Sequence, residues 1–108
     1  NCFSEETYLK TNKHFLKSIK NININDILID NNKVIGISKF NHVNNLFISK
    51  NKKIICDSKQ DILYNNKYIN AEDHPDFIQY NKNTNIMYSL ITSKKTIKID
   101  NYIFKDSL

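Results

Sequence analysis

The feature that most constrains the fold of this 108-residue chain is a series of short apolar runs separated by polar residues. The runs are rich in Ile, Tyr and Phe, which is typical of β-strands, and Asn, Asp, Lys and Ser lie between them. Along the run TIKID, apolar and polar residues alternate, as expected for a strand with one buried face. The runs span residues 22–29, 34–37, 46–48, 54–56, 62–64, 68–69, 87–92, 96–99 and 102–104. This spacing predicts an all-β domain.

Pairs of Asn or Asp residues separate several of these runs and take the place that Gly usually has in tight turns. Asn tolerates a positive φ better than most residues, so each pair predicts a β-hairpin. The pairs are Asn31-Asn32, Asn44-Asn45, Asn65-Asn66 and Asp100-Asn101. Two segments give a weaker pattern. Residues 13–19 are a candidate short helix, and residues 72–80, which hold the only Pro, are expected to form a loop or a helical turn.

Length and composition narrow the class of protein. A chain of 108 residues predicts one domain over residues 1–108 with a single core. The 18 Asn, 18 Ile and 16 Lys, with no Arg, suggest an AT-rich genome. The net charge is +5, but the lysines are scattered and Arg, the usual bidentate reader of phosphate, is absent, so nucleic acid is an unlikely partner. A small basic all-β binding module stays open as an alternative, because 12 Tyr and Phe residues accompany that charge.

Cysteine and histidine usage predicts neither a disulfide framework nor a metal site. Cys2 and Cys56 are the only cysteines, and a reducing intracellular compartment is the simplest inference. No Cys/His spacing is typical of zinc, so no metal or other cofactor is expected. No apolar run is long enough to cross a membrane. The chain begins at Asn1 without Met, from which we expect it to have been cut from a longer protein of unknown localisation.

The opening CFSEETYLKT is similar to the first block of the Hint module, the family shared by inteins and the autoprocessing domain of Hedgehog proteins. That block is a nucleophilic Cys followed by Thr-x-Val/Leu-x-Thr, a pattern that Cys2, Thr7, Leu9 and Thr11 match. The family continues with Lys-x-Ile and then Gly-Asp before an apolar pair. Residues 17–19 and 25–28 follow in that order, with Asn where Gly is usual.

Two later blocks extend the resemblance over nearly the whole chain. In ICDSKQDILYNNKYINAED, the aromatic-apolar pair and the Ala-x-Asp of the family are present, which places Asp57 and Gln60 at the catalytic Thr and His positions. In MYSLITSKKTIKIDNYIFKDS, the family's Tyr-Asp/Asn-Leu-x-Val/Thr run, with Ser89 in place of Asp or Asn, and the final hairpin precede Lys105, Asp106 and Ser107. These three residues occupy the positions of the penultimate His, the terminal Asn and the downstream nucleophile.

The resemblance implies a horseshoe-shaped β fold with adjacent termini and single-turnover self-processing. The Cys2 thiol would attack the Asn1 carbonyl to form a thioester, Ser107 would attack that thioester, and Asp106 would release the downstream segment. Residue 1 and residues 107–108 would then belong to the flanks. The partners implied are the domain's own flanking polypeptides, and the domain is expected to be a monomer.

Several chemical positions differ from the family, so splicing, cleavage at one end and a catalytically inactive remnant all stay open. Gln60 donates hydrogen bonds but cannot transfer a proton near neutral pH as His does. Lys105 is a poor acid-base group at neutral pH unless burial lowers its pKa. Asp106 has no amide nitrogen, so it would cut through an anhydride-like route. The histidines His14, His42 and His74 are candidate substitute proton donors, although we interpret His74-Pro75 as a loop pair and the other two as surface residues.

Overall fold

The computed structural model describes residues 1–41, 44–82 and 86–107 of the chain, and it is all-β as predicted. The helical segments of the described residues are short 3₁₀ turns: η1 (Ile19–Asn21), η2 (Ile29–Asn31) and η3 (Ala71–Asp73). The strands are β1 (Phe3–Ser4), β2 (Tyr8–Lys10), β3 (Leu16–Ser18), β4 (Ile27–Leu28), β5 (Asn32–Asn41), β6 (Leu46–Ser49), β7 (Ile55–Asp57), β8 (Asp61–Tyr64), β9 (Lys67–Asn70), β10 (Phe77–Tyr80), β11 (Ile86–Thr92), β12 (Thr96–Ile99) and β13 (Tyr102–Lys105).

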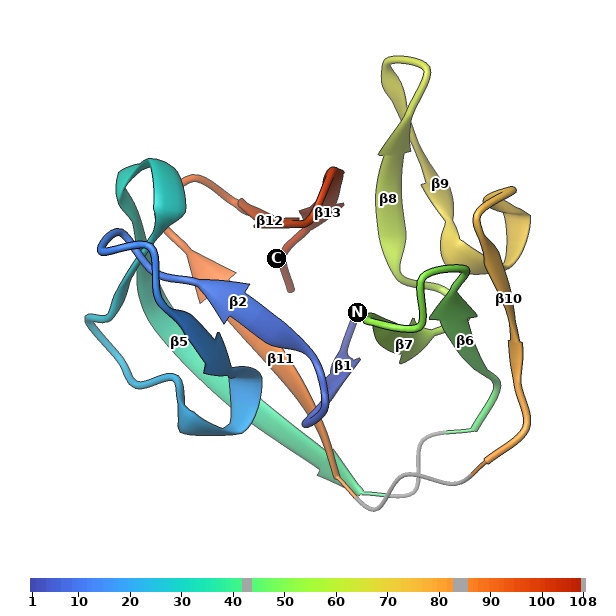
Figure 1. Cartoon of the computed structure of the whole chain (residues 1–108), viewed down its shortest axis with the longest axis horizontal. Helices are drawn as coiled ribbons and strands as arrows, with labels where there is room; N and C mark the ends of the chain where they lie inside the picture. The colour runs from blue at the N-terminus through green and yellow to red at the C-terminus, as the bar shows by residue number, and fades with distance from the viewer. Residues whose placement is uncertain (42–43, 83–85, 108) are drawn as a thin grey trace.

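The strands form three sheets that place the first and last strands near the middle of the molecule (Figure 1). The seven-stranded sheet has the order β10-β6-β7-β1-β11-β5-β4, so β1 lies between β7 and β11. The four-stranded sheet has the order β12-β13-β8-β9, and β2 and β3 form the third sheet, which is two-stranded. No helix in the described segments has the length and apolar character that a membrane crossing requires.

The polar pairs account for most of the turns. Asn65 and Asn66 both have a positive φ, at 50° and 68°, and they join the paired strands β8 and β9. Asp100, with φ 53°, turns the chain between β12 and β13. Asn31, with φ 61°, closes the connection between β4 and β5. The hairpin predicted at Asn44-Asn45 is wrong, because β5 pairs with β4 and β11 whereas β6 pairs with β7 and β10.

The two weaker segments differ from prediction in part. The helix expected over residues 13–19 is absent: strand β3 and then η1 occupy that stretch, where Ser18 Oγ donates a 2.6 Å hydrogen bond to the Glu5 carbonyl. Residues 72–80 contain the expected helical turn, η3, but also strand β10, which the sequence did not predict. Each of these short strands forms because it pairs with a distant partner or hairpin arm, and such pairing overrides weak local propensity.

The hydrophobic core joins the two ends of the chain. Phe3 on β1 and Phe104 on β13 are buried and pack edge to face, with ring centroids 5.0 Å apart. An aromatic pair of this geometry stabilises by about 0.5–1.5 kcal/mol beyond the burial of its surface. Because each ring is one or two residues from a predicted nucleophile or junction residue, core packing itself brings Cys2 and Asp106 into one region.

Candidate functional site at the meeting of the two chain ends

Backbone hydrogen bonds fix both ends of the chain next to the central strands. The Asp57 N–H donates to the Cys2 carbonyl at 3.2 Å, which extends the pairing of β1 with β7. At the other end, the Asp106 N–H donates to the Lys95 carbonyl at 3.2 Å, and the Ser107 N–H donates to the Leu90 carbonyl at 3.0 Å. Neither end is therefore a loose tail within the described residues.

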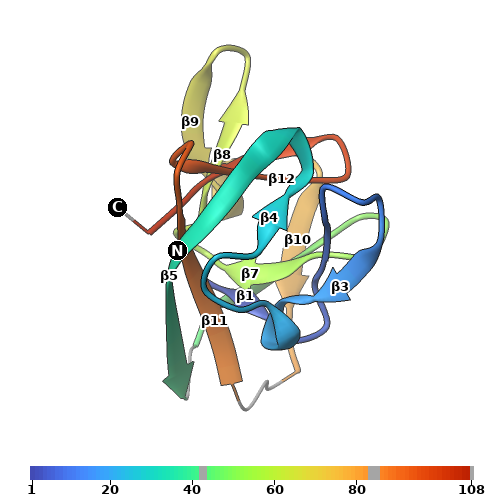
Figure 2. The same ribbon diagram turned by 90° about the vertical axis from the view of Figure 1, so that its left-hand side faces the viewer.

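The two ends of the chain lie in the same region of the molecule (Figures 1 and 2), and hydrogen bonds join them. Ser107 Oγ donates a 3.5 Å hydrogen bond to the carbonyl oxygen of Asn1, the residue before Cys2. Asn1 Nδ2 in turn donates a 3.3 Å hydrogen bond to the carbonyl oxygen of Asp106. The residues that make these contacts are more than a hundred positions apart in the chain, so the fold creates this junction.

The Cys2 thiol is buried and held in its protonated form. Its exposed fraction is 4%, and it packs with Leu46, Ile55 and Met87. Burial raises the pKa of Cys2 to about 12, the negative charge of Asp57 adds to the rise, and the α-amino group of residue 1 opposes it. A thiol in this setting becomes a nucleophile only if a neighbouring group removes its proton during the attack.

Asp57 is the acidic group next to that thiol. Its Oδ2 accepts a 3.3 Å hydrogen bond from the Asn1 backbone nitrogen. Its Oδ1 is buried and accepts no hydrogen bond from the described residues. A buried carboxylate oxygen without a donor is costly to leave unpaired. The sequence placed Asp57 where the Hint family has Thr, and the structure places it beside Cys2.

Gln60 ties the C-terminal strand to the start of β8. Its side chain is fully buried, and its Nε2 donates to the Lys105 carbonyl at 3.0 Å and to the Asp61 carbonyl at 3.2 Å. Gln60 Oε1 is buried and, like Asp57 Oδ1, accepts no hydrogen bond from the described residues. The Gln60 amide group thus donates to one backbone carbonyl on β8 and to one at the downstream end of the chain. The side chain holds the downstream junction in place, and it supplies no proton to the upstream one.

Asp106 belongs to the junction, whereas the side chain of Lys105 does not. Asp106 is fully buried, and its Oδ2 accepts a 2.9 Å hydrogen bond from the Thr92 N–H. The Lys105 side chain is exposed, and its Nζ lies over the Tyr68 ring at 5.8 Å from the centroid. Lys105 therefore contributes its backbone carbonyl to the junction, through Gln60, and its ammonium group points to β9.

Neither described histidine replaces the missing proton donor. His14 is exposed in a turn with φ 66°. His74 is buried among aromatic rings, where its Nδ1 accepts a 3.0 Å hydrogen bond from the Asp76 N–H. Burial lowers the pKa of His74, with Asp76 acting in the opposite direction. In the described part of the chain, neither side chain hydrogen-bonds to a junction residue, and His42 lies outside the described residues.

The sequence missed three groups of the site. They are the carboxamide of Asn1, the N–H of Asp61, which donates to Asn1 Oδ1 at 3.3 Å, and the N–H of Thr92. Two of the three are backbone groups, and no residue type marks a backbone group as functional. The Asn1 carboxamide could not be recognised from the sequence because Asn is among the commonest residues in the chain, so a single Asn gives no signal.

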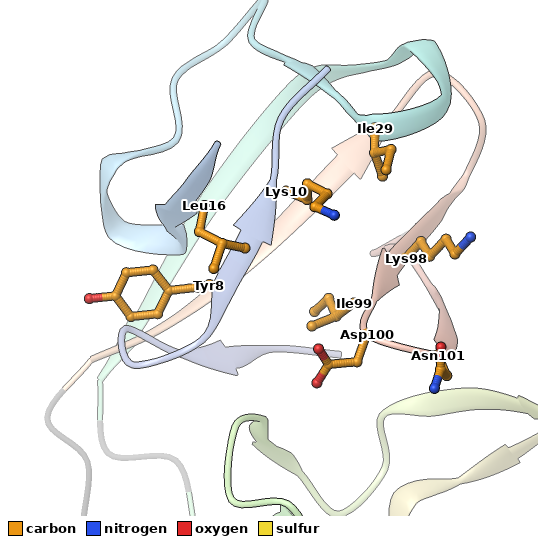
Figure 3. Close-up of a pocket in the computed structure, with 8 residues that line it drawn as sticks. All are labelled: Tyr8, Lys10, Leu16, Ile29, Lys98, Ile99, Asp100 and Asn101. Atoms are coloured by element: carbon orange, nitrogen blue, oxygen red, sulfur yellow. The ribbon is translucent and has the colours of Figure 1, made fainter. Parts of the chain in front are cut away.

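A surface pocket lies apart from this junction (Figure 3). It is formed by the β2–β3 hairpin, Ile29 and the β12–β13 turn, and none of the predicted site residues lines it. Its charged side chains are Lys10, Lys98 and Asp100, a mixture without the concentrated positive charge that phosphate binding requires. Among the residues that the structure describes, no group of three or more His, Cys, Asp or Glu side chains is arranged to hold a metal ion.

No protein-family model matches the chain, and no curated protein matches it in a sequence comparison. The resemblance to the Hint module therefore rests on the sequence motifs of the chain. The geometry of the junction is an observation that does not depend on those motifs.

Protonation of the Cys2 thiol leads to a pH-dependent prediction. With a pKa of about 12 in the native state, against an ordinary 9.0, the thiolate fraction at pH 8 is lower by about 10³-fold than in unfolded chain. We expect iodoacetamide to modify native Cys2 at least about 10³-fold more slowly than urea-unfolded Cys2 at pH 8. Peptide mapping by mass spectrometry separates Cys2 from Cys56. Equal rates in the two states would contradict the buried thiol.

The raised pKa of Cys2 also makes the free energy of unfolding depend on pH in the alkaline range. The native state retains the thiol proton up to a pH of about 12, whereas the unfolded chain loses it near 9.0. The unfolded state therefore binds fewer protons between these values, and the free energy of unfolding falls as the pH rises. The slope from this one group is about 1.4 kcal/mol per pH unit.

Proposed function

We propose that this chain is a self-processing domain of the Hint type, which cuts and joins its own flanking polypeptides through Cys2, Asp106 and Ser107. The observation that carries the proposal is the 3.5 Å contact between Ser107 Oγ and the Asn1 carbonyl oxygen. The acceptor nucleophile and the carbonyl group that it must finally attack are already neighbours in the folded chain. Placement of this kind converts a reaction between separate groups into an intramolecular one, worth up to about 7–11 kcal/mol of barrier.

In the first step, the Cys2 thiol passes its proton to the Asp57 carboxylate, and Sγ attacks the Asn1 carbonyl carbon. The Asn1–Cys2 C–N bond then breaks, a thioester joins Asn1 to Sγ, and the Cys2 nitrogen leaves as an amine with the proton that Asp57 held. Burial supports this step in one respect, because a thioester at a 4% exposed sulfur is shielded from hydrolysis.

In the second step, Ser107 Oγ attacks the thioester carbonyl carbon and loses its proton to the departing sulfur. An ester now joins Asn1 to Ser107, and the Cys2 thiol is restored. Near-attack geometry for such a transfer has reacting atoms about 3–3.5 Å apart. The 3.5 Å hydrogen bond from Ser107 Oγ to the Asn1 carbonyl oxygen places this nucleophile beside the carbonyl group, and the attack requires Oγ to move from the oxygen to the carbon.

In the third step, an Asp106 carboxylate oxygen attacks the Asp106 backbone carbonyl carbon. The Asp106–Ser107 C–N bond breaks, the Ser107 nitrogen takes a proton from solvent water and leaves as an amine, and Asp106 is left as a small cyclic anhydride that water opens. The freed Ser107 amine then displaces its own Oγ from the ester, which yields a normal peptide bond between the flanks. Gln60 supports this step by holding the Lys105 carbonyl, one residue upstream of the breaking bond.

A second candidate is a Hint-like remnant that has lost the upstream step. The observation that favours it is the environment of Cys2: a pKa of about 12, with the Gln60 amide hydrogens committed to the carbonyls of Asp61 and Lys105. A general acid ordinarily contributes about 10²–10⁴-fold to such a reaction. Without it at the Cys2 nitrogen, only Asp57 is left to return a proton.

Mass spectrometry of a fusion with unrelated, well-folded proteins before Asn1 and after Leu108 tests the proposal. Splicing is expected to give a product joining the two flanks and a free domain. Addition of a thiol is expected to release the upstream flank by thioester exchange. In a Ser107→Ala fusion, upstream release with thiol is expected to persist while the joined product disappears. An intact fusion under every condition, with the fold retained, would instead identify the inactive remnant.

A further inference from the structure

The side chain of Asn1 is bound at both of its polar ends. Asn1 Oδ1 accepts a hydrogen bond from the Asp61 N–H, and Asn1 Nδ2 donates one to the Asp106 carbonyl, each at 3.3 Å. One backbone donor and one backbone acceptor match the two ends of a carboxamide, whose oxygen accepts and whose nitrogen donates. This site is thus complementary to the residue that precedes Cys2.

We propose that the Asn1 carboxamide is a catalytic group for cleavage of the opposite junction, where its Nδ2–H polarises the carbonyl of the Asp106–Ser107 bond. The inference rests on the proposed self-processing function and adds a residue of the upstream flank to its downstream step. The upstream flank would thereby act as both substrate and part of the catalytic site.

The chemistry of the third step explains why a donor is needed at this oxygen. When the Asp106 carboxylate attacks its own backbone carbonyl carbon, an electron pair moves onto the carbonyl oxygen before the C–N bond breaks. A fixed N–H aimed at that oxygen stabilises the developing charge. Asn1 Nδ2 already donates to the Asp106 oxygen in the ground state.

Two consecutive residues at the start of β8 fix the geometry of this donor. Gln60 holds the Lys105 carbonyl through its Nε2, and the Asp61 N–H holds Asn1 Oδ1. Both sides of the contact are therefore tied to the same short segment, so donor and acceptor keep their relative position. The contact also survives the second step, because the ester joins the Asn1 carbonyl to the Ser107 side chain beside Asp106.

Substitutions at Asn1 distinguish the effect of hydrogen-bond donation by Nδ2 from the effects of side-chain size and charge. Asn1→Ala removes both hydrogen bonds. Asn1→Asp is nearly isosteric but replaces the donor by a second acceptor and adds negative charge to a junction that already contains two acidic residues, Asp57 and Asp106. Asn1→Gln keeps the carboxamide on a longer stem. If donation by Nδ2 accelerates the reaction, downstream cleavage is expected to be fastest with Asn at position 1, slower with Gln, slower again with Ala and slowest with Asp.

The experiment uses a fusion with both flanks and Cys2→Ala, in which upstream chemistry is blocked and Asn1 stays attached. The rate of downstream cleavage is followed by mass spectrometry. We expect Asn1→Ala to lower it about tenfold, the value of one neutral hydrogen bond, and Asn1→Asp to lower it further. Asn12→Ala, at an exposed asparagine outside the junction, is the matched control and is expected to leave the rate unchanged.

A second readout, the carbonyl ¹³C chemical shift of Asp106 in the same fusions, does not depend on activity. We expect Asn1→Ala and Asn1→Asp to move this resonance and Asn12→Ala to leave it in place. An unmoved resonance in Asn1→Ala would overturn the inference even in a domain that cleaves, as would a cleavage rate that is the same in all Asn1 variants. A third outcome is that the resonance moves but no fusion cleaves, including the parent that has Asn1 and an intact Cys2. That outcome would overturn the proposed function and, with it, the catalytic role of Asn1.

Discussion

Replacement of Cys2 by alanine is expected to abolish thiol-dependent release of the upstream flank and formation of the joined product. The first covalent bond of the proposed reaction is made by Cys2 Sγ, and no other described nucleophile is bonded to residue 1. Loss of a covalent nucleophile ordinarily lowers a rate by about 10⁴-fold or more, because the remaining groups cannot act without it. The measurement is the time course of intact fusion and released flank by mass spectrometry, with and without added thiol.

The effect of Cys2→Ala is separable from unfolding. Truncation of this small side chain is expected to lower the free energy of unfolding by about 1 kcal/mol, which leaves the domain folded in urea titrations. Cys56→Ala is the matched control, since Cys56 is also buried but lies on β7 in the main core cluster and is not bonded to residue 1. It is expected to retain thiol-dependent release. Equal release from Cys2→Ala and the parent would refute a thioester mechanism.

The sequence predicted the class of fold because strand formation in this chain is marked locally. Nearly every strand of four residues or more coincides with an Ile-, Tyr- or Phe-rich run, and three of the four Asn or Asp pairs place a residue at positive φ between consecutive strands that pair with each other. Prediction failed where pairing decided the structure. Strands β1, β3 and β10 are short and irregular in sequence, and they are strands because β11, β2 and β6, respectively, pair with them.

The turn at Asn44-Asn45 failed for a related reason. A polar pair between two apolar runs predicts that the chain bends, and it says nothing about which strands then pair. Here β6 leaves the long β5 strand and pairs with β7 and β10 instead. The arrangement of strands in a sheet depends on contacts between residues far apart in sequence, which no local pattern contains.

The side chains of the candidate site could be selected from the sequence, whereas its backbone groups could not. Cys2, Asp57, Gln60, Asp106 and Ser107 come from three separate segments, and the structure brings them to one junction. That meeting supports their selection by resemblance, and their catalytic roles stay proposals. The N–H groups of Asp61 and Thr92 give no signal in sequence, because every non-proline residue carries the same group.

The outward orientation of Lys105 could have been predicted from strand alternation. On β13 and just beyond it, Phe104 is fully buried, Lys105 is exposed and Asp106 is fully buried. This alternation with a period of two is the normal pattern for a strand with one buried face. A residue on this outer face directs its side chain away from the buried Asp106.

Replacement of Asp106 by alanine is expected to abolish downstream cleavage while upstream release with thiol persists. The Asp106 side chain closes the small ring on the carbonyl of the Asp106–Ser107 bond, so its loss removes the nucleophile of the third step, at a cost of about 10⁴-fold or more. The substitution also leaves the buried Thr92 N–H without its 2.9 Å acceptor, which is expected to lower the free energy of unfolding by about 1–3 kcal/mol. Thermal unfolding and the masses of the two released flanks measure these effects separately.

Asp106→Asn distinguishes a chemical role of this side chain from a purely structural one. The asparagine Oδ1 can still accept the Thr92 N–H, so stability is expected to stay close to that of the parent. Its Nδ2 attacks the same carbonyl to form a stable cyclic imide, whereas the anhydride formed by Asp106 readily reverts when the Ser107 amine attacks it. We therefore expect Asp106→Asn to raise the rate of downstream cleavage at least about tenfold, a barrier difference of about 1.4 kcal/mol. A variant as stable as the parent that cleaves no faster, together with an unchanged rate in Asp106→Ala, would show that Asp106 holds β13 in place and takes no part in the reaction.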